Sequence, residues 1–221
     1  MLTYHRVLDG PDISEAMHPG MYVTREVFER HLEYLSKKYC VVTLNQLREW
    51  IQGKLSFPGT PCAITFDDGW DDNYRNAYPL LKRFNLPATI FVITGDIGSR
   101  EMLTWNQVRE MEAWGIAFES HTVSHVVLRG RQREEIQQEL RGSKQRLQNE
   151  LNRSIGWFCY PKGIYDEIAD EVVQELYSAA FTGELGLVEK GDDLFHLRRI
   201  GIHNDVSMTV PLFACRLTTF L

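Results

Sequence analysis

The sequence predicts a single α/β domain, a distorted (β/α)7-type barrel that takes in residues 1–221. Short apolar runs alternate with longer segments of helical periodicity, which favours a parallel sheet wound by helices. About seven runs are strand candidates, and repeated right-handed crossovers would close such a sheet into a barrel. Polar clusters follow three of the runs, at the strand ends where barrels of this kind carry their chemistry.

The first five elements lead the chain into the earliest polar cluster. Residues 24–38 form a helix, because a threonine can cap its start and apolar residues recur at helical spacing. Residues 41–43 form a short strand and residues 44–52 a short helix. Two prolines and a glycine make residues 56–61 a loop. Residues 62–66 are an apolar run of the buried-strand type.

The rest of the chain continues the alternation. A long charged segment is the longest of the remaining helices, and the strands between the helices are short. The expected helices are 73–84, 106–114 and 133–152, and the expected strands are 88–93, 116–120, 157–160, 179–182 and 198–202.

Charge and hydropathy exclude two classes of partner. The chain has 24 basic and 30 acidic residues and a formal charge of -6, so we expect no nucleic-acid partner. No apolar run approaches the ~20 residues that a membrane span requires. The final stretch is interrupted by Pro211 and Arg216, so we expect no membrane span there either.

Cysteine usage and the start of the chain bear on the compartment. Cys40, Cys62, Cys159 and Cys215 are widely separated among apolar neighbours, so we expect them to be reduced and buried. The first residues lack the basic region and apolar stretch of an export signal. We therefore expect a cytoplasmic protein if Met1 is the native start, and an exported or membrane-associated one if a signal has been removed.

Two adjacent aspartates, Asp67 and Asp68, follow the expected strand over residues 62–66. Adjacent side chains at a strand end diverge, so one carboxylate can bind a cation while its neighbour faces a substrate water. An isolated Asp-Asp-Gly is also typical of a turn with a helix cap, and that alternative stays open here. Asp71 and Asp72 are expected to be solvated residues of the next helix start, where acidic side chains suit the helix dipole.

His121 and His125 place two imidazoles four residues apart, close enough to reach one ion. Such pairs also occur on solvated helices without a metal. Here the pair follows a strand and is combined with aspartates from another strand end, and two histidines with one carboxylate form a recurrent open metal site. We expect a divalent ion; Zn²⁺ suits this set best, and Ni²⁺, Co²⁺ or Fe²⁺ are also accepted by it.

Three motifs together resemble a known family. Thr65-Phe66-Asp67-Asp68-Gly69, His121-Thr122-Val123-Ser124-His125 and Tyr160-Pro161-Lys162-Gly163 are similar to the first three motifs of the polysaccharide deacetylases, carbohydrate esterase family 4, which carry the NodB homology domain. The opening Tyr4-His5-Arg6-Val7 and the segment from Pro87 to Val92 resemble the branch that includes poly-N-acetylglucosamine deacetylases. The resemblance implies a metal-assisted removal of N-acetyl groups from an N-acetylated glycan.

The resemblance also implies residue roles. Asp67 would be the general base, and Asp68, His121 and His125 the metal ligands. The backbone amide of Lys162 would help to form the oxyanion hole, although the family usually has an aromatic residue there.

An orienting arginine is missing from the third motif. Cys159 sits about where the family has it, so such an arginine must come from elsewhere in the chain. Arg199, at the start of a late strand, is the candidate, and a salt bridge at the barrel rim is the alternative.

The general acid is expected to be a histidine. The branch that begins with Tyr-His would supply it from the first strand as His5, and His203, after a late strand, is the rival. His18, His31 and His196 have no partner motif and are expected to serve structure or surface. The aromatic residues Tyr4 and Trp105 are expected to belong to the core, as most aromatic residues do, with stacking on a sugar as the alternative.

Two other functions remain open on these residues. The first is the same metal site acting on a small amide or an O-acetyl sugar, which the departures at Cys159 and Lys162 allow. The second is a catalytically inactive carbohydrate-binding protein. The pairing of Asp67 with a metal site argues against that second function, because a binding module needs no base beside its metal.

Overall fold

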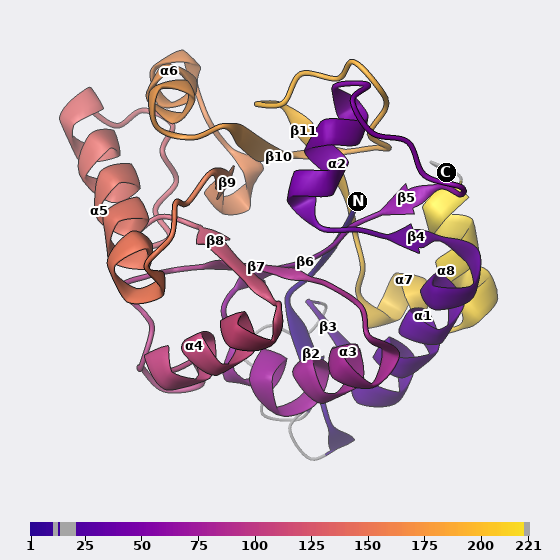
Figure 1. Cartoon of the computed structure of the whole chain (residues 1–221). Coiled ribbons are helices and arrows are strands. Elements are labelled where there is room, and N and C mark those ends of the chain that lie inside the picture. Colours follow the sequence, from indigo (N-terminus) through magenta and orange to yellow (C-terminus); the bar gives the residue numbers. More distant parts are fainter. Residues whose placement is uncertain (11–12, 14–20, 219–221) are drawn as a thin grey trace.

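The computed structural model describes residues 1–10, 13 and 21–218. In this part of the chain seven parallel strands close into a barrel in the order β1-β11-β10-β9-β8-β7-β6 (Figure 1). The prediction of a distorted (β/α)7-type barrel is confirmed. The barrel strands are β1 (Leu2–Tyr4), β6 (Ile64–Asp68), β7 (Thr89–Val92), β8 (Ala117–Ser120), β9 (Trp157–Cys159), β10 (Ala179–Leu185) and β11 (Leu197–Gly201).

The first strand closes the barrel. Thr3 of β1 lies opposite Thr65 of β6 on one side and opposite Gly201 of β11 on the other. The chain therefore leaves β1 at the same rim as the end of β6, and His5 comes to lie near Asp67.

One expected barrel strand lies outside the barrel. The run over residues 41–43 was expected to be one of the seven, but β4 (Cys40–Val41) pairs with β5 (Pro61–Cys62) in a separate two-stranded sheet. Its place in the barrel belongs to β1. A second small sheet joins β2 (Arg6–Leu8) to β3 (Tyr22–Thr24).

The helices surround the barrel and agree closely with the expected ranges. Thr24 caps α1 as expected, since its side chain accepts a hydrogen bond from the Val27 amide. Helices α6, α7 and α8 were not expected. The α-helices are α1 (Arg25–Lys38), α2 (Leu44–Ile51), α3 (Tyr78–Phe84), α4 (Trp105–Trp114), α5 (Arg133–Leu151), α6 (Glu167–Leu176), α7 (Asn204–Ser207) and α8 (Val210–Thr218).

The helix expected over residues 73–84 begins with a wider turn. Asn73–Ala77 is π-helical and precedes α3. Pro79 lies in the first turn of α3 and has no amide hydrogen to donate to the carbonyl four residues earlier, so the regular helical bond is missing there.

The barrel strands separate two apolar regions, because alternate side chains point to opposite faces. Phe91, Cys159 and Phe181 belong to an inner cluster that also contains residues of α2, which therefore covers the amino end of the barrel. Phe66 and Ile90 belong to a larger cluster between the barrel and the outer helices. The carboxyl end is left for polar side chains.

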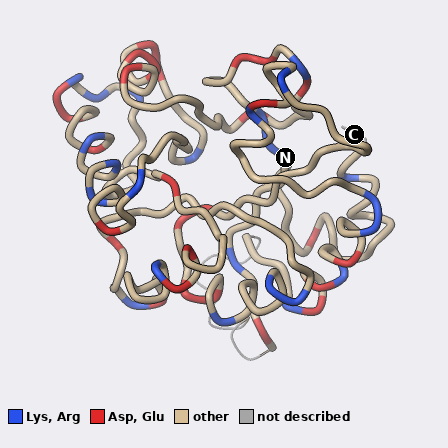
Figure 2. Tube along the Cα trace, in the orientation of Figure 1, with Lys and Arg blue, Asp and Glu red and all other residues tan. Residues whose placement is uncertain are grey.

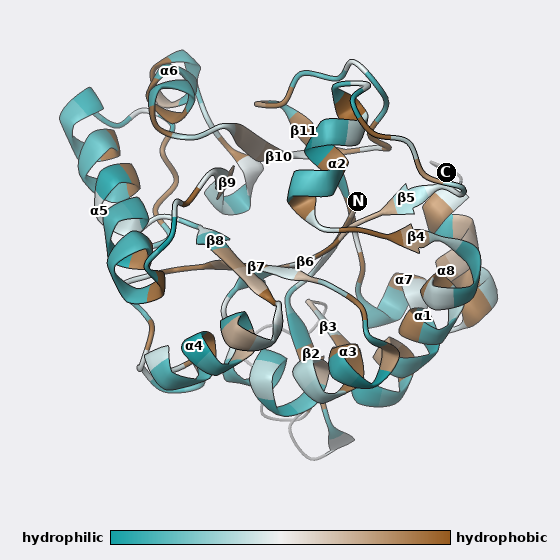
Figure 3. Cartoon of the chain, viewed as in Figure 1, coloured by the Kyte–Doolittle hydropathy of each residue, from teal (hydrophilic) through white to brown (hydrophobic). Residues whose placement is uncertain are grey.

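Charge and hydropathy follow this arrangement. Figure 2 shows basic and acidic residues interspersed along the outer helices. In Figure 3 helix α5 is mostly hydrophilic, in keeping with its charged sequence, and the barrel strands carry much of the hydrophobic colouring. Among the described helices, none combines the length and the apolar character that crossing a bilayer would require.

Candidate active site

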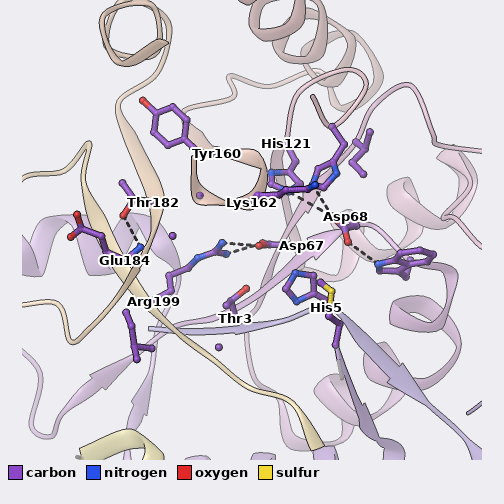
Figure 4. A pocket seen from close by; sticks show the side chains of 18 of the residues that line it. Thr3, His5, Asp67, Asp68, His121, Tyr160, Lys162, Thr182, Glu184 and Arg199 are labelled. Carbon is purple, nitrogen blue, oxygen red and sulfur yellow. Dashed lines mark hydrogen bonds and ion pairs between the residues drawn. The ribbon is translucent and has the colours of Figure 1, made fainter. Parts of the chain in front are cut away.

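A cavity of about 850 Å³ opens at the carboxyl ends of the barrel strands (Figure 4). The residues that the sequence singled out for chemistry all line this cavity, although they come from five separate stretches of the chain. They are His5, Asp67, Asp68, His121, His125, Lys162 and Arg199. The barrel thus brings together side chains that are up to 194 positions apart in the sequence, counting from 5 to 199.

Three of these side chains form a candidate metal centre. Nε2 of His121 lies 3.6 Å from Oδ1 of Asp68, and Nε2 of His125 lies 3.5 Å from the same oxygen. The three potential ligand atoms all lie within 4.8 Å of one another. Two imidazole nitrogens and one carboxylate oxygen are the donor set of open sites for Zn²⁺ and related ions, so these residues fit a divalent ion.

Hydrogen bonds orient two of the three ligands. Nδ1 of His121 donates to the backbone carbonyl of Cys159 at 2.7 Å, which leaves Nε2 with its lone pair toward Asp68. The indole of Trp70 donates to Oδ2 of Asp68 at 3.0 Å, which leaves Oδ1 toward the two histidines. Burial lowers the pKa of His121 against the opposing charges of Asp67 and Asp68, so the ring is held in the neutral form that binds a metal.

The backbone is strained around this centre. The φ angles of Asp68, Thr122 and His125 are 75°, 68° and 57°. These values lie in the left-handed region, which residues other than glycine rarely adopt. The hydroxyl of Thr122 accepts a hydrogen bond from the His125 amide at 2.9 Å and supports the turn between the two histidines. Clustered strain of this kind is typical of sites whose geometry is maintained for function.

Asp67 is held by Arg199. The guanidinium of Arg199 donates to both carboxylate oxygens of Asp67, each at 2.7 Å, and both side chains are buried. Burial alone would raise the pKa of Asp67. The charge and hydrogen bonds of Arg199, helped by His121 and His5, instead hold that pKa well below its usual range. Asp67 is therefore an anion that points into the cavity beside the metal centre.

Arg199 reaches the site from β11, in the space beside Cys159. Its guanidinium lies 2.9 Å from the Cys159 sulfur and 3.2 Å from the hydroxyl of Thr65. The potential ligand atoms of Cys159, Asp67 and His121 also lie within 4.8 Å of one another and form a second cluster. A cation is disfavoured at that second cluster, because the guanidinium already lies against both the thiol and the carboxylate.

Lys162 lies in a tight turn at the cavity wall. The turn Pro161–Gly163 gives Lys162 a φ of 56° and Gly163 a φ of 67°. A Cβ atom on Gly163 would lie 2.0 Å from the Cα of Gly183, so only glycine fits where this turn meets β10. This close approach positions the backbone of Lys162 beside the cavity.

The structure separates the two histidines that compete for the role of general acid. His5 lines the cavity, and the side-chain amide of Asn73 donates a hydrogen bond to the backbone carbonyl of His5 at 2.9 Å. His203 is absent from the residues that line the cavity and instead bonds Asp205 at 2.8 Å.

Two of the other histidines, His31 and His196, have structural contacts. His31 is buried and donates from Nε2 to the Ser207 carbonyl at 2.7 Å. His196 lies 3.2 Å from Asp170 and 2.7 Å from Asp193. His18 lies outside the described residues.

Several expectations about individual side chains are wrong. Asp72 was expected to be solvated but is fully buried, where it accepts hydrogen bonds from Arg6 and from the Val7 amide. By contrast, the expected place of Tyr4 and Trp105 in the core is confirmed: Tyr4 is buried in the outer cluster, and Trp105 packs against it, partly buried. The cysteines are free as expected, yet Cys215 is exposed and Cys40 only half-buried.

Sequence reasoning missed some residues of the cavity wall. Trp70, Met102 and the stretch 182–185 of β10 all line it. Trp70 directly follows Asp67-Asp68-Gly69, and its proximity to the motif was the available signal. Residues 183–185 lie beyond the expected strand end at position 182, because β10 continues to Leu185.

Comparisons with known proteins agree with this geometry. A family model described as polysaccharide deacetylase matches residues 54–180. The Bacillus subtilis protein named "Putative polysaccharide deacetylase YxkH" is 31% identical over 210 residues, which are 94% of this chain and 72% of that protein. The poly-beta-1,6-N-acetyl-D-glucosamine N-deacetylase of Staphylococcus aureus is 25% identical, over 92% of this chain and 78% of the relative.

A solved structure shares the whole fold. The structure of IcaB from Ammonifex degensii superposes with a TM-score of 0.86 at 27% identity, and the match covers 99% of this chain and 96% of that one.

Proposed function

Because the chain belongs to the polysaccharide deacetylase family, we propose that it is a metal-dependent hydrolase that removes N-acetyl groups from a glycan containing N-acetylglucosamine. One observation carries the proposal: Asp68, His121 and His125 converge on one point, and the ionised Asp67 lies beside them in the same cavity. The substrate class rests on the likeness to the Staphylococcus aureus enzyme, whose name gives poly-beta-1,6-N-acetyl-D-glucosamine as its substrate.

In this proposal the ion is held by Asp68, His121 and His125. A divalent ion bound there supplies Lewis acidity, which polarises the acetyl carbonyl and makes a water molecule more acidic. Zn²⁺ is the ion we favour for this donor set, and Ni²⁺, Co²⁺ and Fe²⁺ are alternatives.

Asp67 acts as the general base. Its carboxylate takes the proton of the attacking water, and Arg199 keeps it ionised and oriented between turnovers. Burial favours the neutral acid, but the charge and hydrogen bonds of Arg199 lower the pKa of Asp67, so its carboxylate is ionised at neutral pH. An inactive binding protein would need no base beside its metal, so the position of Asp67 argues against that alternative.

Two other groups complete the reaction. The backbone amide of Lys162 donates to the oxyanion, a contribution of about 3 kcal/mol for each donor in comparable sites. His5, which lines the same cavity as the metal ligands (Figure 4), donates a proton to the nitrogen of the leaving amine.

The test is release of acetate by the purified protein, with each metal added in turn. The panel contains N-acetylglucosamine oligomers, peptidoglycan fragments, nucleotide-linked sugars, O-acetyl sugars and small amides. We expect acetate from N-acetylated oligomers. Acetate released only from the last two classes would contradict the proposed substrate.

The variant Asp67→Asn tests the mechanism. It should abolish deacetylation and leave the metal content intact, because Asp67 is not one of the proposed ligands. Full activity of Asp67→Asn would exclude Asp67 as the base.

A further inference from the structure

We propose that Arg6 is a positioning residue of the metal centre: it holds the indole of Trp70 so that Trp70 fixes the ligand Asp68. This inference rests on the metal centre of the proposed function. It gives a role to the buried pair of Arg6 and Asp72, and to the half-buried Glu101 beside it, which the mechanism above does not use.

The first link is the hydrogen bond between Trp70 and Asp68. The indole nitrogen donates to Oδ2 of Asp68 at 3.0 Å, while Oδ1 faces both histidines at 3.5 and 3.6 Å. The two oxygens are therefore divided between the orienting donor and the ion. A hydrogen bond to the second oxygen of a ligating carboxylate fixes the orientation of the first, and the indole of Trp70 provides that bond.

The second link is the packing of Arg6 on Trp70. The Arg6 guanidinium carbon lies 4.3 Å from the centre of a Trp70 ring, within the range of a cation–π contact. Trp70 is only 8% exposed, so this contact is largely shielded from water. The backbone of Trp70 also forms an isolated antiparallel bridge with Met102.

The third link fixes Arg6 itself. Its Nε donates to Asp72 at 2.8 Å, and its NH2 group lies 3.1 Å from Glu101. Asp72 also accepts the Val7 amide at 2.7 Å, which ties it to the strand that carries Arg6. The guanidinium is therefore fixed from two sides and has one orientation over the indole.

The cost of this cluster indicates a purpose beyond stability. Arg6 and Asp72 are both buried, and NH1 of Arg6 has no hydrogen-bond partner among the described residues. A buried ion pair stabilises a protein little once its desolvation is counted, and an unpaired donor adds a further cost. A defined orientation for Trp70, and through it for Asp68, is what this arrangement provides.

The test measures Zn²⁺ affinity by competition with a chromophoric chelator, which does not depend on catalysis. Trp70→Phe keeps an aromatic ring but loses the indole donor, and Arg6→Met loses the cation over the ring. We expect each to weaken Zn²⁺ binding about ten- to a hundredfold, as is usual when a partner of a metal ligand is removed. Because Arg6 acts through Trp70, Arg6→Met should add little in the Trp70→Phe background.

A matched pair elsewhere in the chain supplies the control. Arg146 lies 5.2 Å from a ring of Trp105 on the outer helices, away from the cavity. Trp105→Phe and Arg146→Met should leave Zn²⁺ affinity unchanged. If Arg6→Met does not fold, Arg6→Met with Asp72→Asn replaces it, since that pair leaves no unpaired buried charge.

Wild-type affinity in folded Arg6→Met, or an equal loss on adding Arg6→Met to Trp70→Phe, would overturn the inference alone. A wild-type protein that binds no divalent ion would overturn the metal centre and this inference together. A loss in both single variants that is not additive supports the inference.

Discussion

Removing Arg199 should destabilise the protein strongly, and removing Asp67 as well should restore most of the loss. Arg199→Met leaves the Asp67 carboxylate buried without the two hydrogen bonds of 2.7 Å that it now accepts. The side chains of Asp67 and Arg199 are only 6% and 8% exposed, so water cannot readily replace those bonds.

The magnitude follows from that burial. Breaking a buried ion pair on one side typically costs about 3 to 5 kcal/mol, because an uncompensated charge remains. Thr65 and Cys159 also contact the guanidinium, but both are neutral and cannot offset the charge of Asp67. We expect Arg199→Met to lose about 4 kcal/mol of unfolding free energy, and Arg199→Met with Asp67→Asn to recover more than half of that loss.

The assay is urea-induced unfolding of the wild type, both single variants and the double variant, all with chelator present so that metal binding does not contribute. The four unfolding free energies give the coupling between the two side chains. A coupling below about 1 kcal/mol, typical of an exposed ion pair, would refute the reasoning.

Other predictions concern separate parts of the molecule. Asp68→Ala should weaken Zn²⁺ binding at least about 100-fold by equilibrium dialysis, and chelator should abolish acetate release by the wild type until Zn²⁺ is restored. Burial lowers the pKa of His31 from 6.5 to about 4. As the pH falls, His31 is therefore protonated in the unfolded chain at a higher pH than in the folded chain. The stability contributed by neutral His31 is present above pH 6.5 and is lost toward pH 4, by up to about 3 kcal/mol. In His31→Gln the unfolding free energy measured with urea should change less between pH 6.5 and pH 4. An unchanged pH dependence would show that His31 does not cause this loss of stability. Lys162→Met should keep kcat within about threefold, because the proposed donor is a backbone amide. Gly163→Ala should instead lower the melting temperature and kcat, since its Cβ would lie 2.0 Å from Gly183; normal values would show that the turn can move.

Local patterns in the sequence determined much of this protein. Hydrophobic periodicity located most helices and strands, because side chains that face a core must recur with the period of the element. The spacing of His121 and His125, with Asp68 after an earlier strand, indicated a metal centre, because those donors are few and their chemistry is specific. The resemblance of three short motifs indicated the family, which the comparisons show.

Only the tertiary structure decided which strands close the barrel and which side chains meet. The short strand β1 carries little periodicity, yet its pairing with both β6 and β11 places His5 in the cavity. The contact of Arg199 with Asp67 joins residues 132 positions apart. Asp72 was expected at a solvated helix start, but it is buried and accepts a hydrogen bond from Arg6 of β2. Such contacts depend on strand order and register, which local composition does not encode, so they appear only when the chain has folded.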